Sequence, residues 1–292
     1  MRRSLSDRAR RQAQNGTHTT DQLLRQFMLQ RFLARVFADP DGSWVLKGGI
    51  GLLIRLPAAR HSQDIDLLNT DRDTVAAVKE LQHLANSRQD GDPLTFTFVL
   101  GTPVAMSGGV AGVRVPVETY LGARVDRFTI DLSTELHMVG RLERTYPDPV
   151  LDVPWLPPLP EFVLYPLADQ VADKVCAMYE RHGEQQRPSS RYRDLVDILL
   201  IIGSLALDAE QTITALAAES HRRGLTLPAQ LTEPDPQWTR GYREIARTST
   251  LDPLLHDLQT ALTRAGACLD PLLKRQITAG NWNYTDGTWQ IP

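Results

Sequence analysis

The residues whose type and spacing most clearly predict chemistry are two carboxylates separated by one apolar residue, Asp64 and Asp66. A strand here would place both aspartates on one face and Ile65 and Leu67 on the other, because successive side chains alternate across a sheet. Two carboxylates on one face repel each other unless a cation lies between them. The pair is therefore a candidate ligand set for Mg²⁺, which takes oxygen ligands. The alternative is a pair of solvated aspartates at a strand end.

A glycine turn precedes these carboxylates. The apolar run Trp44-Val45-Leu46 has strand character and leads through Lys47 into Gly48-Gly49, after which an apolar helix begins. A strand that passes through glycines into a helix presents backbone N–H groups and the positive end of the helix dipole, which suits a phosphate group. On its own, such a turn is more often only a turn.

A third carboxylate, Asp131, lies in the run Phe128–Leu132, whose β-branched surroundings predict a strand. If this strand lay beside that of Asp64 and Asp66, Asp131 would complete a metal site of three carboxylates. It could then also accept the proton of an attacking hydroxyl. An exposed aspartate at a strand end is the alternative.

A second group of charged residues follows in the C-terminal half. Lys174 lies within the otherwise apolar run Leu167–Met178, and a half-buried lysine needs an anionic partner, of which a triphosphate is one. Asp194 and Asp197 lie three residues apart, so a helix would place them on one face. The alternative is a structural ion pair between either aspartate and a nearby arginine. These arginines are Arg181, Arg191 and Arg193.

The elements that position these residues follow from the periodicity of apolar side chains. Helices are predicted from a cap at Thr20-Asp21 to Phe37 and over Asp73–Asn86, the second with Val75, Val78, Leu81 and Leu84 facing the core. Strand-like runs follow at Thr95–Leu100, Val113–Tyr120 and Phe128–Leu132.

A cluster of prolines between Pro147 and Pro166 forbids a long helix and predicts an extended segment. Helical patterns resume over 167–182, 192–204, 208–223, 239–247 and 253–265, and the stretch from Ile277 is predicted to be irregular. We therefore expect an α+β protein of two domains. Residues 1–160 would form a mixed sheet flanked by helices, and residues 161–292 would form a mainly helical domain.

Composition limits the class of protein. The net charge of −3 and a pI near 6.2 provide no bulk attraction to nucleic acid, so any contact with it must be local. Candidate sites for such contacts are basic clusters at Arg2/Arg3/Arg10/Arg11, Arg187/Arg191/Arg193 and Arg222/Arg223. Two cysteines, Cys176 and Cys268, are too few for a disulfide framework and fit a reducing cytoplasm. We expect no membrane span and no secretory signal, and a monomer is the default.

In this order and spacing, the motifs resemble those of the polymerase-beta-like nucleotidyltransferases. The string Leu46-Lys47-Gly48-Gly49, followed by Arg60-x-Ser62-x-Asp64-Ile65-Asp66-Leu67, is similar to that of the AbiEii/Men-type toxin branch of this superfamily. Lys174 and the later string Arg193-Asp194-x-x-Asp197-Ile198 extend the resemblance. One departure is Ile50-Gly51, where relatives usually carry Thr-Ala, so a hydroxyl contact to phosphate is not expected at that position.

The resemblance implies a nucleotidyltransferase that uses Mg²⁺ or Mn²⁺ and a nucleoside triphosphate. Asp64 and Asp66 would be catalytic and would hold the metal ion together with Asp131. Lys47, Gly48, Gly49 and Ser62 would contact the nucleotide phosphates. The helical domain would contribute Lys174, which would bind phosphate and neutralise the leaving pyrophosphate, and Asp194, which would take part in catalysis.

The same resemblance implies a toxin that transfers a nucleotide to the 3′ end of tRNA in the cytoplasm, which blocks aminoacylation and translation. A cognate antitoxin would be its partner. One rival is a nucleotidyltransferase that modifies a small molecule or a protein hydroxyl, and another is a non-catalytic nucleotide-binding interaction protein. A further hypothesis concerns Ser62, because a phosphate placed there would repel nucleotide from the site.

Overall fold

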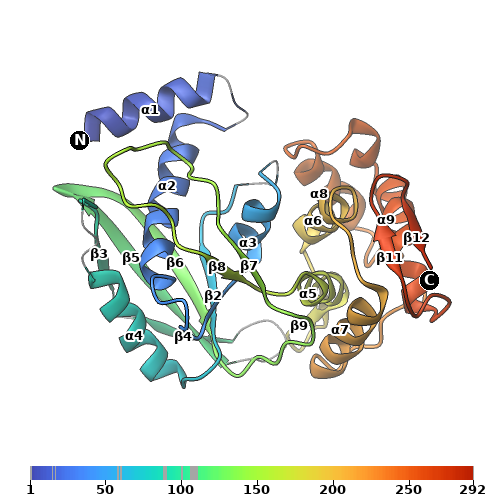
Figure 1. Ribbon diagram of the computed structural model, residues 1–292. Helices are drawn as coiled ribbons and strands as arrows, with labels where there is room; N and C mark the ends of the chain where they lie inside the picture. The colour runs from blue at the N-terminus through green and yellow to red at the C-terminus, as the bar shows by residue number, and fades with distance from the viewer. Residues whose placement is uncertain are drawn as a thin grey trace. The chain divides into compact units, whose positions relative to one another are not determined.

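The computed structural model of the chain describes residues 2–14, 16, 18–57, 59, 61–87, 91–99, 101–105 and 111–291. The chain forms two compact units (Figure 1). Unit 1 comprises Met1–Arg55, His61–Leu136 and Leu142–Tyr165. Unit 2 comprises Pro166–Pro292 and the short pieces Leu56–Arg60 and His137–Arg141. The extended proline-containing segment therefore belongs mainly to unit 1.

Unit 1 is built on a mixed sheet with the strand order β3-β5-β6-β2-β1-β8-β7, in which β4 also pairs with β5. The strands are β1 (Trp44–Lys47), β2 (Ile65–Asn69), β3 (Thr95–Phe98), β4 (Thr102–Ala105), β5 (Ala111–Leu121), β6 (Ala123–Ser133), β7 (Glu143–Thr145) and β8 (Phe162–Leu164). β2 runs parallel to β6 and β1 parallel to β8, whereas the other pairs are antiparallel. The predicted mixed sheet is confirmed. The sequence does not predict β4, β7 and β8, which are short and are polar or lie beside prolines.

One face of the central strands is apolar. Leu46 on β1, Leu67 on β2 and Leu132 on β6 lie side by side in register and are fully buried. Ile65, two residues before Leu67, is buried on the same face. Because side chains alternate along a strand, Asp66 projects from the opposite face, as predicted, whereas Asp64 precedes the strand.

Helix α2 (Thr20–Val36) packs against the sheet, with α1 (Arg2–Gln14) against it in turn. The ring of Phe32 meets Phe96 of β3 and Phe128 of β6 edge-to-face, with centroid distances of 5.2 and 5.4 Å. The cap of α2 is Thr19, not Thr20-Asp21 as predicted. Thr19 and Gln22 form a capping box in which each side chain accepts the other residue's backbone N–H, and this places the cap one residue earlier.

Helix α4 (Thr74–Asn86) also packs near the sheet, and Asp73 caps it. The prediction that Val75 faces the core is wrong, since Val75 is 65% exposed. Leu81 is buried as predicted, together with Ala77 and Ala85. Ala77, Leu81 and Ala85 follow one another at four-residue spacing and form the buried face of the helix, and Val75 lies outside it.

Unit 2 is mainly helical, as predicted. Its helices are α5 (Leu167–Tyr179), α6 (Tyr192–Ile202), α7 (Ala209–Arg222), α8 (Trp238–Ala246), the 3₁₀ turn η2 (Pro253–His256) and α9 (Leu258–Leu273). α5 packs on α6 and α7, and α6 packs on α8 and α9. Two hairpins complete the unit: β9 (Arg181–His182) with β10 (Arg187–Pro188), and β11 (Asn281–Asn283) with β12 (Thr288–Gln290).

Three predictions for unit 2 are corrected. The helix predicted over 167–182 ends at Tyr179, because Arg181–His182 pairs with Arg187–Pro188 as a strand. The helix predicted over 253–265 is divided into η2 and α9, and α9 continues past Pro271. The stretch from Ile277, predicted to be irregular, contains the hairpin β11–β12. There the rings of Trp282 and Trp289 meet edge-to-face at a centroid distance of 5.7 Å, so pairing of two aromatic side chains across the hairpin accompanies its short strands.

Both cysteines are free thiols and are buried in unit 2. Burial raises the pKa of the Cys176 thiol to about 12, because a thiolate would lose its hydration there. Within the described part of the chain, no helix combines the length and the apolar character needed to cross a membrane.

Candidate active site

A row of four charged residues, the charged row, crosses the polar face of the sheet in unit 1. Lys47 ends β1, Asp66 lies opposite it on β2, Asp131 is level with Asp66 on β6, and Arg114 lies opposite Asp131 on β5. In-register neighbours on adjacent strands share a face, so these side chains follow one another across the sheet with signs plus, minus, minus, plus. Three of the predicted residues, Lys47, Asp66 and Asp131, are thus adjacent.

The backbone turn at Gly48 lies directly against Asp66. Gly48 is the first residue of α3 (Gly48–Arg55), which follows β1 without a loop, as the predicted strand–glycine–helix turn requires. Its φ is +61°, and a Cβ at this position would lie 2.5 Å from Cγ of Asp66 and overlap the carboxylate. Both the backbone conformation and the close approach therefore require glycine. The first turn of α3, which contains Gly48 and Gly49, begins beside the Asp66 carboxylate.

The loop before β2 holds Ser62 and Asp64. Asp64 is exposed, whereas Ser62 is buried and donates its hydroxyl hydrogen bond to the carbonyl oxygen of Asp64 at 3.2 Å. Ser62 therefore restrains the backbone that leads Asp64 into β2. A phosphate contact or a phosphorylation at Ser62 would require its hydroxyl to leave this bond. Arg60, from the same motif, lies outside the described residues.

Asp131 is bound by Arg114, a residue that the sequence analysis does not single out. Nε and Nη2 of Arg114 donate to Oδ1 and Oδ2 of Asp131 at 2.7 and 2.8 Å. The hydrogen bond and charge of Asp131 raise the pKa of Arg114, and the charges of Asp64 and Asp66 raise it further. All three carboxylates therefore act electrostatically on one guanidinium group.

Among the residues that the structure describes, no three histidine, cysteine, aspartate or glutamate side chains converge as a preformed metal site. The predicted set Asp64, Asp66 and Asp131 does not form such a site, because both oxygens of Asp131 accept hydrogen bonds from Arg114. Mg²⁺ is commonly held by one or two carboxylates together with substrate phosphates and water. Asp66, against the glycine turn, and Asp64, just before β2 and acting on the same guanidinium, fit a divalent cation that binds with a nucleotide.

Tyr165 positions Lys47. Nζ of Lys47 lies 4.8 Å from the centroid of the buried Tyr165 ring, a cation–π geometry. The Tyr165 backbone N–H donates to Leu46 at 2.8 Å, and its carbonyl accepts from Nη2 of Arg55, at the end of α3, at 2.7 Å. No sequence motif marks Tyr165, because its contact with Lys47 depends on the pairing of β8 with β1.

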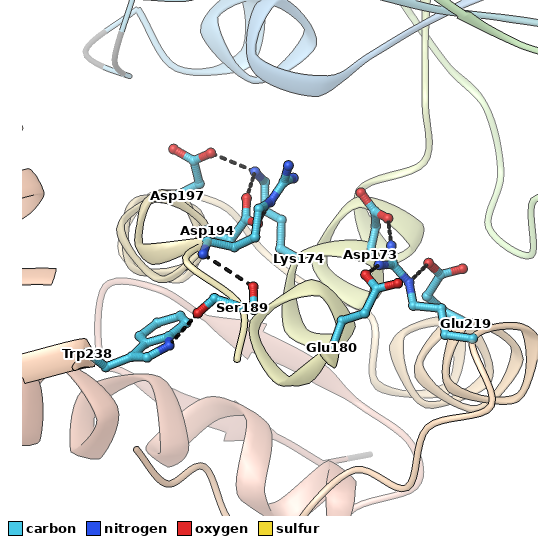
Figure 2. A network of polar contacts seen from close by, with 10 residues as sticks. Asp173, Lys174, Glu180, Ser189, Asp194, Asp197, Glu219 and Trp238 are labelled. Carbon is cyan, nitrogen blue, oxygen red and sulfur yellow. Dashed lines mark hydrogen bonds and ion pairs between the residues drawn. The ribbon is translucent and has the colours of Figure 1, made fainter. Parts of the chain in front are cut away.

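The second group of predicted residues forms a buried ion network in unit 2 (Figure 2). Nζ of Lys174, on α5, donates to Oδ1 of Asp194 at 3.1 Å and to Oδ2 of Asp197 at 2.6 Å, both on α6. Nε of Arg191 donates to the second oxygen of Asp194 at 2.7 Å. Lys174, Asp194 and Asp197 are 5%, 2% and 0% exposed. Two cations thus face two carboxylates, which offsets the cost of burying charge.

These contacts bear on the predicted alternatives. The structural ion pair between Asp194 and a nearby arginine is present, and the arginine is Arg191. Lys174 has anionic partners in the two aspartates of α6. The roles of Lys174 in phosphate binding and of Asp194 in catalysis stay predictions.

The prediction that Arg223 could meet an RNA backbone is wrong. Arg223 follows α7, and its side chain is 0% exposed. It pairs with Asp173 and Glu180 of the α5 region and with Glu219 of α7 (Figure 2 shows these carboxylates). A guanidinium enclosed by three carboxylates stabilises the packing of α5 against α7 and is not accessible to a polyanion.

A pH-sensitive contact lies in the loop before Asp64. Nδ1 of His61 lies 3.1 Å from Nε2 of Gln26 on α2, and only a neutral imidazole nitrogen can accept a hydrogen bond from that amide. Burial, followed by the charges of Arg25 and His18, lowers the pKa of His61 below its ordinary value of 6.5. The folded protein therefore binds this proton more weakly than the unfolded chain does.

The contribution of His61 to stability is fully present above pH 6.5 and is lost as the pH falls through the lowered pKa. We expect the midpoint of urea unfolding to fall on going from about pH 8 to about pH 5, and to fall less in His61→Gln, which lacks the titrating group. Parallel pH profiles for the two proteins would contradict this assignment.

Comparison with known proteins agrees with this architecture. Residues 31–264 match the family model "Nucleotidyl transferase AbiEii toxin, Type IV TA system". Among solved structures, the nucleotidyltransferase toxin MenT4 from Mycobacterium tuberculosis H37Rv is similar with a TM-score of 0.53 and 17% identity, over 90% of this chain and 98% of MenT4. JHP933 from Helicobacter pylori has a TM-score of 0.44 and 15% identity, over 87% and 93% of the two chains. No curated protein matches the chain.

The family match covers both groups of charged residues, the charged row of unit 1 and the network around Lys174. The similarity to MenT4 extends over nearly the whole chain and shows a common fold. The predicted resemblance and the α+β fold class are therefore confirmed. The chain belongs to the AbiEii nucleotidyltransferase toxin family of type IV toxin–antitoxin systems.

Proposed function

We propose that the protein transfers a nucleoside monophosphate from a nucleoside triphosphate to the 3′ end of tRNA. The transfer would block aminoacylation and translation, and a cognate antitoxin would neutralise the protein. The observation that carries the proposal is the alignment of Lys47, Asp66 and Asp131 on one sheet face beside the turn at Gly48, in a chain of this toxin family. The choice of tRNA as acceptor rests on the family resemblance.

In the proposed reaction, the acceptor hydroxyl oxygen forms a bond to the α-phosphorus while the bond from that phosphorus to pyrophosphate breaks. Asp131, next to Asp66 in the charged row, is the candidate base for the hydroxyl proton. Lys47 and the first turn of α3, with Gly48 and Gly49, would bind phosphate through positive charge and backbone N–H groups. Pyrophosphate leaves with the electrons of the broken bond.

Asp64 and Asp66 would hold Mg²⁺ or Mn²⁺, which when bound neutralises the charge of the phosphates. Asp64, Asp66 and Asp131 carry three negative charges, and Lys47 and Arg114 of the charged row offset only two of them, so the face still repels a polyanionic substrate. This remaining negative charge supports a dependence on divalent cations.

Lys174 is proposed to neutralise the leaving pyrophosphate, and Asp194 to take part in catalysis. Within unit 2, the ammonium group is already oriented by Asp194 and Asp197. A cation held by its own counter-ions loses little conformational entropy when it meets a phosphate, which favours such a role.

The test is to incubate the protein with Mg²⁺, total tRNA and each α-labelled nucleoside triphosphate in turn, and to look for labelled RNA on a gel. We expect label on tRNA with one or more of the nucleotides. Asp66→Ala should reduce it about a hundredfold or more, because the site loses a charge that acts on the reacting groups. Asp71→Ala is the control, since Asp71 is exposed beyond the other end of β2 and pairs with Ser43.

Label on a small molecule or on protein, but not on RNA, would support nucleotidyl transfer and would show that the acceptor is not tRNA. Absence of transfer to any acceptor, with toxicity in cells unchanged by Asp66→Ala, would favour the non-catalytic interaction protein.

A further inference from the structure

The ion pair between Arg114 and Asp131 lies in the middle of the site that the proposed function assigns to a metal ion and a nucleotide. Both residues belong to the hairpin of β5 and β6 in unit 1. The pair is bidentate, with both oxygens of Asp131 accepting hydrogen bonds from the guanidinium. The side chain of Arg114 is 55% exposed and that of Asp131 is 21% exposed. The guanidinium is therefore well ordered by its partner but open to solvent on its other side.

The arrangement creates a competition for Asp131. A divalent cation near Asp66 would be repelled by the guanidinium and would compete with it for the oxygens of Asp131. A triphosphate would attract the same guanidinium. Its planar donors match a phosphate as well as a carboxylate, since both accept two parallel hydrogen bonds.

We propose that Arg114 is a resident counter-ion that holds Asp131 until a divalent cation takes that carboxylate, and that the released guanidinium then binds the phosphates of the nucleotide. The inference rests on the proposed function. It assigns Arg114 a role as a positioning residue in the apo protein and as a phosphate ligand in the loaded protein.

This exchange couples the two ligands. Metal alone must overcome the Arg114–Asp131 pair, whereas metal that arrives with nucleotide provides the guanidinium with a new anionic partner. Each ligand therefore increases the affinity of the other, by the same factor in both directions. Without Arg114, metal should bind more tightly on its own, and nucleotide should strengthen metal binding less.

The experiment measures binding of Mn²⁺ to the full-length protein by electron paramagnetic resonance of the free ion, with and without a non-hydrolysable nucleoside triphosphate analogue. In Arg114→Gln, we expect the Kd for Mn²⁺ without nucleotide to fall about tenfold, because a repelling charge and a competing ion pair are removed. The factor by which the analogue tightens Mn²⁺ binding should fall as well.

Two further variants test the specificity of the effect. Arg114→Lys keeps the charge but not the paired donors, so its Kd should lie between those of Arg114→Gln and the wild type. Arg124→Gln removes an exposed arginine of the same hairpin that pairs with Glu118, and should leave both quantities unchanged. Thermal unfolding of each variant without ligands checks that it is folded.

In folded Arg114→Gln, the Kd for Mn²⁺ and its coupling to the nucleotide analogue could both be unchanged. This result would mean that Arg114 has only a structural role in the hairpin, and it would overturn this inference but not the proposed function. Absence of Mn²⁺ binding in the wild type and in every variant, with or without the analogue, would overturn the proposed metal dependence and this inference together.

Discussion

Replacing Lys174 with methionine is expected to lower the free energy of unfolding by about 3–5 kcal/mol, because one partner of a buried ion network is removed. The ammonium binds Asp194 and Asp197, which are 2% and 0% exposed. Methionine keeps an unbranched apolar side chain of similar length, so the decrease in the free energy of unfolding comes mainly from the removal of the positive charge. Urea unfolding followed by circular dichroism measures the effect.

Arg240→Met is the matched control for Lys174→Met. Arg240 pairs with Glu244 on α8 of the same unit, but their side chains are 89% and 65% exposed, so water already screens the pair. Its removal should hardly move the unfolding midpoint. Equal effects of the two substitutions would mean that the network does not depend on the ammonium. A loss of transfer activity in Lys174→Met must therefore be measured under conditions where the variant is folded before it is assigned to phosphate binding.

Gly48→Ala is expected to abolish nucleotidyl transfer as completely as Asp66→Ala does. The new Cβ would overlap the Asp66 carboxylate, which must then leave its position in the charged row. The positive φ adds about 1–2 kcal/mol of strain, because an L side chain is disfavoured in this conformation. Transfer of label and thermal unfolding, measured on the same preparation, separate the two effects.

Gly122→Ala is the control that measures how much stability is lost through the positive φ alone. Gly122, in the turn between β5 and β6, has a φ of +75°, and nothing lies within 4 Å of a Cβ placed there. The control should lose only the stability that comes from the backbone conformation, about 1–2 kcal/mol, and should keep its activity. If Gly48→Ala retained activity, the carboxylate of Asp66 would have room to adjust, and the glycine would be needed for its backbone conformation only.

Local patterns were sufficient to predict the central part of the site. The alternation Asp64-Ile65-Asp66-Leu67 predicts two carboxylates on one face and two buried apolar residues on the other. In the structure Ile65 and Leu67 are buried and Asp66 lies on the polar face of β2, whereas Asp64 is in the loop directly before the strand. The passage from an apolar run through Gly48 into a helix predicts the turn that lies against Asp66. Both follow from a side-chain period of two residues and from the conformational freedom of glycine, which are properties of a few neighbouring residues.

Long-range contacts were predicted less well. The adjacency of Asp131 and Asp66 depends on the parallel pairing of β6 with β2, which the sequence analysis treats as one of two alternatives. In unit 2, the helical spacing of Asp194 and Asp197 places them on one face, but that face meets Lys174 only through the packing of α5 on α6. The first residue of α2 and the buried face of α4 also differ from the predictions, because both depend on contacts that periodicity alone does not define.

The sequence by itself determined the residue types of the candidate site, the face of β2 on which Asp66 lies and the turn at Gly48, because these follow from local backbone geometry. Only the tertiary structure decided that Arg114 binds Asp131. The register of β5 and β6 shifts by one residue between Thr119 and Tyr120, and without that irregularity Arg114 would lie opposite Ile130. A shift of one residue exchanges the two faces of a strand, so a single irregularity in the hairpin brings the guanidinium to the carboxylates.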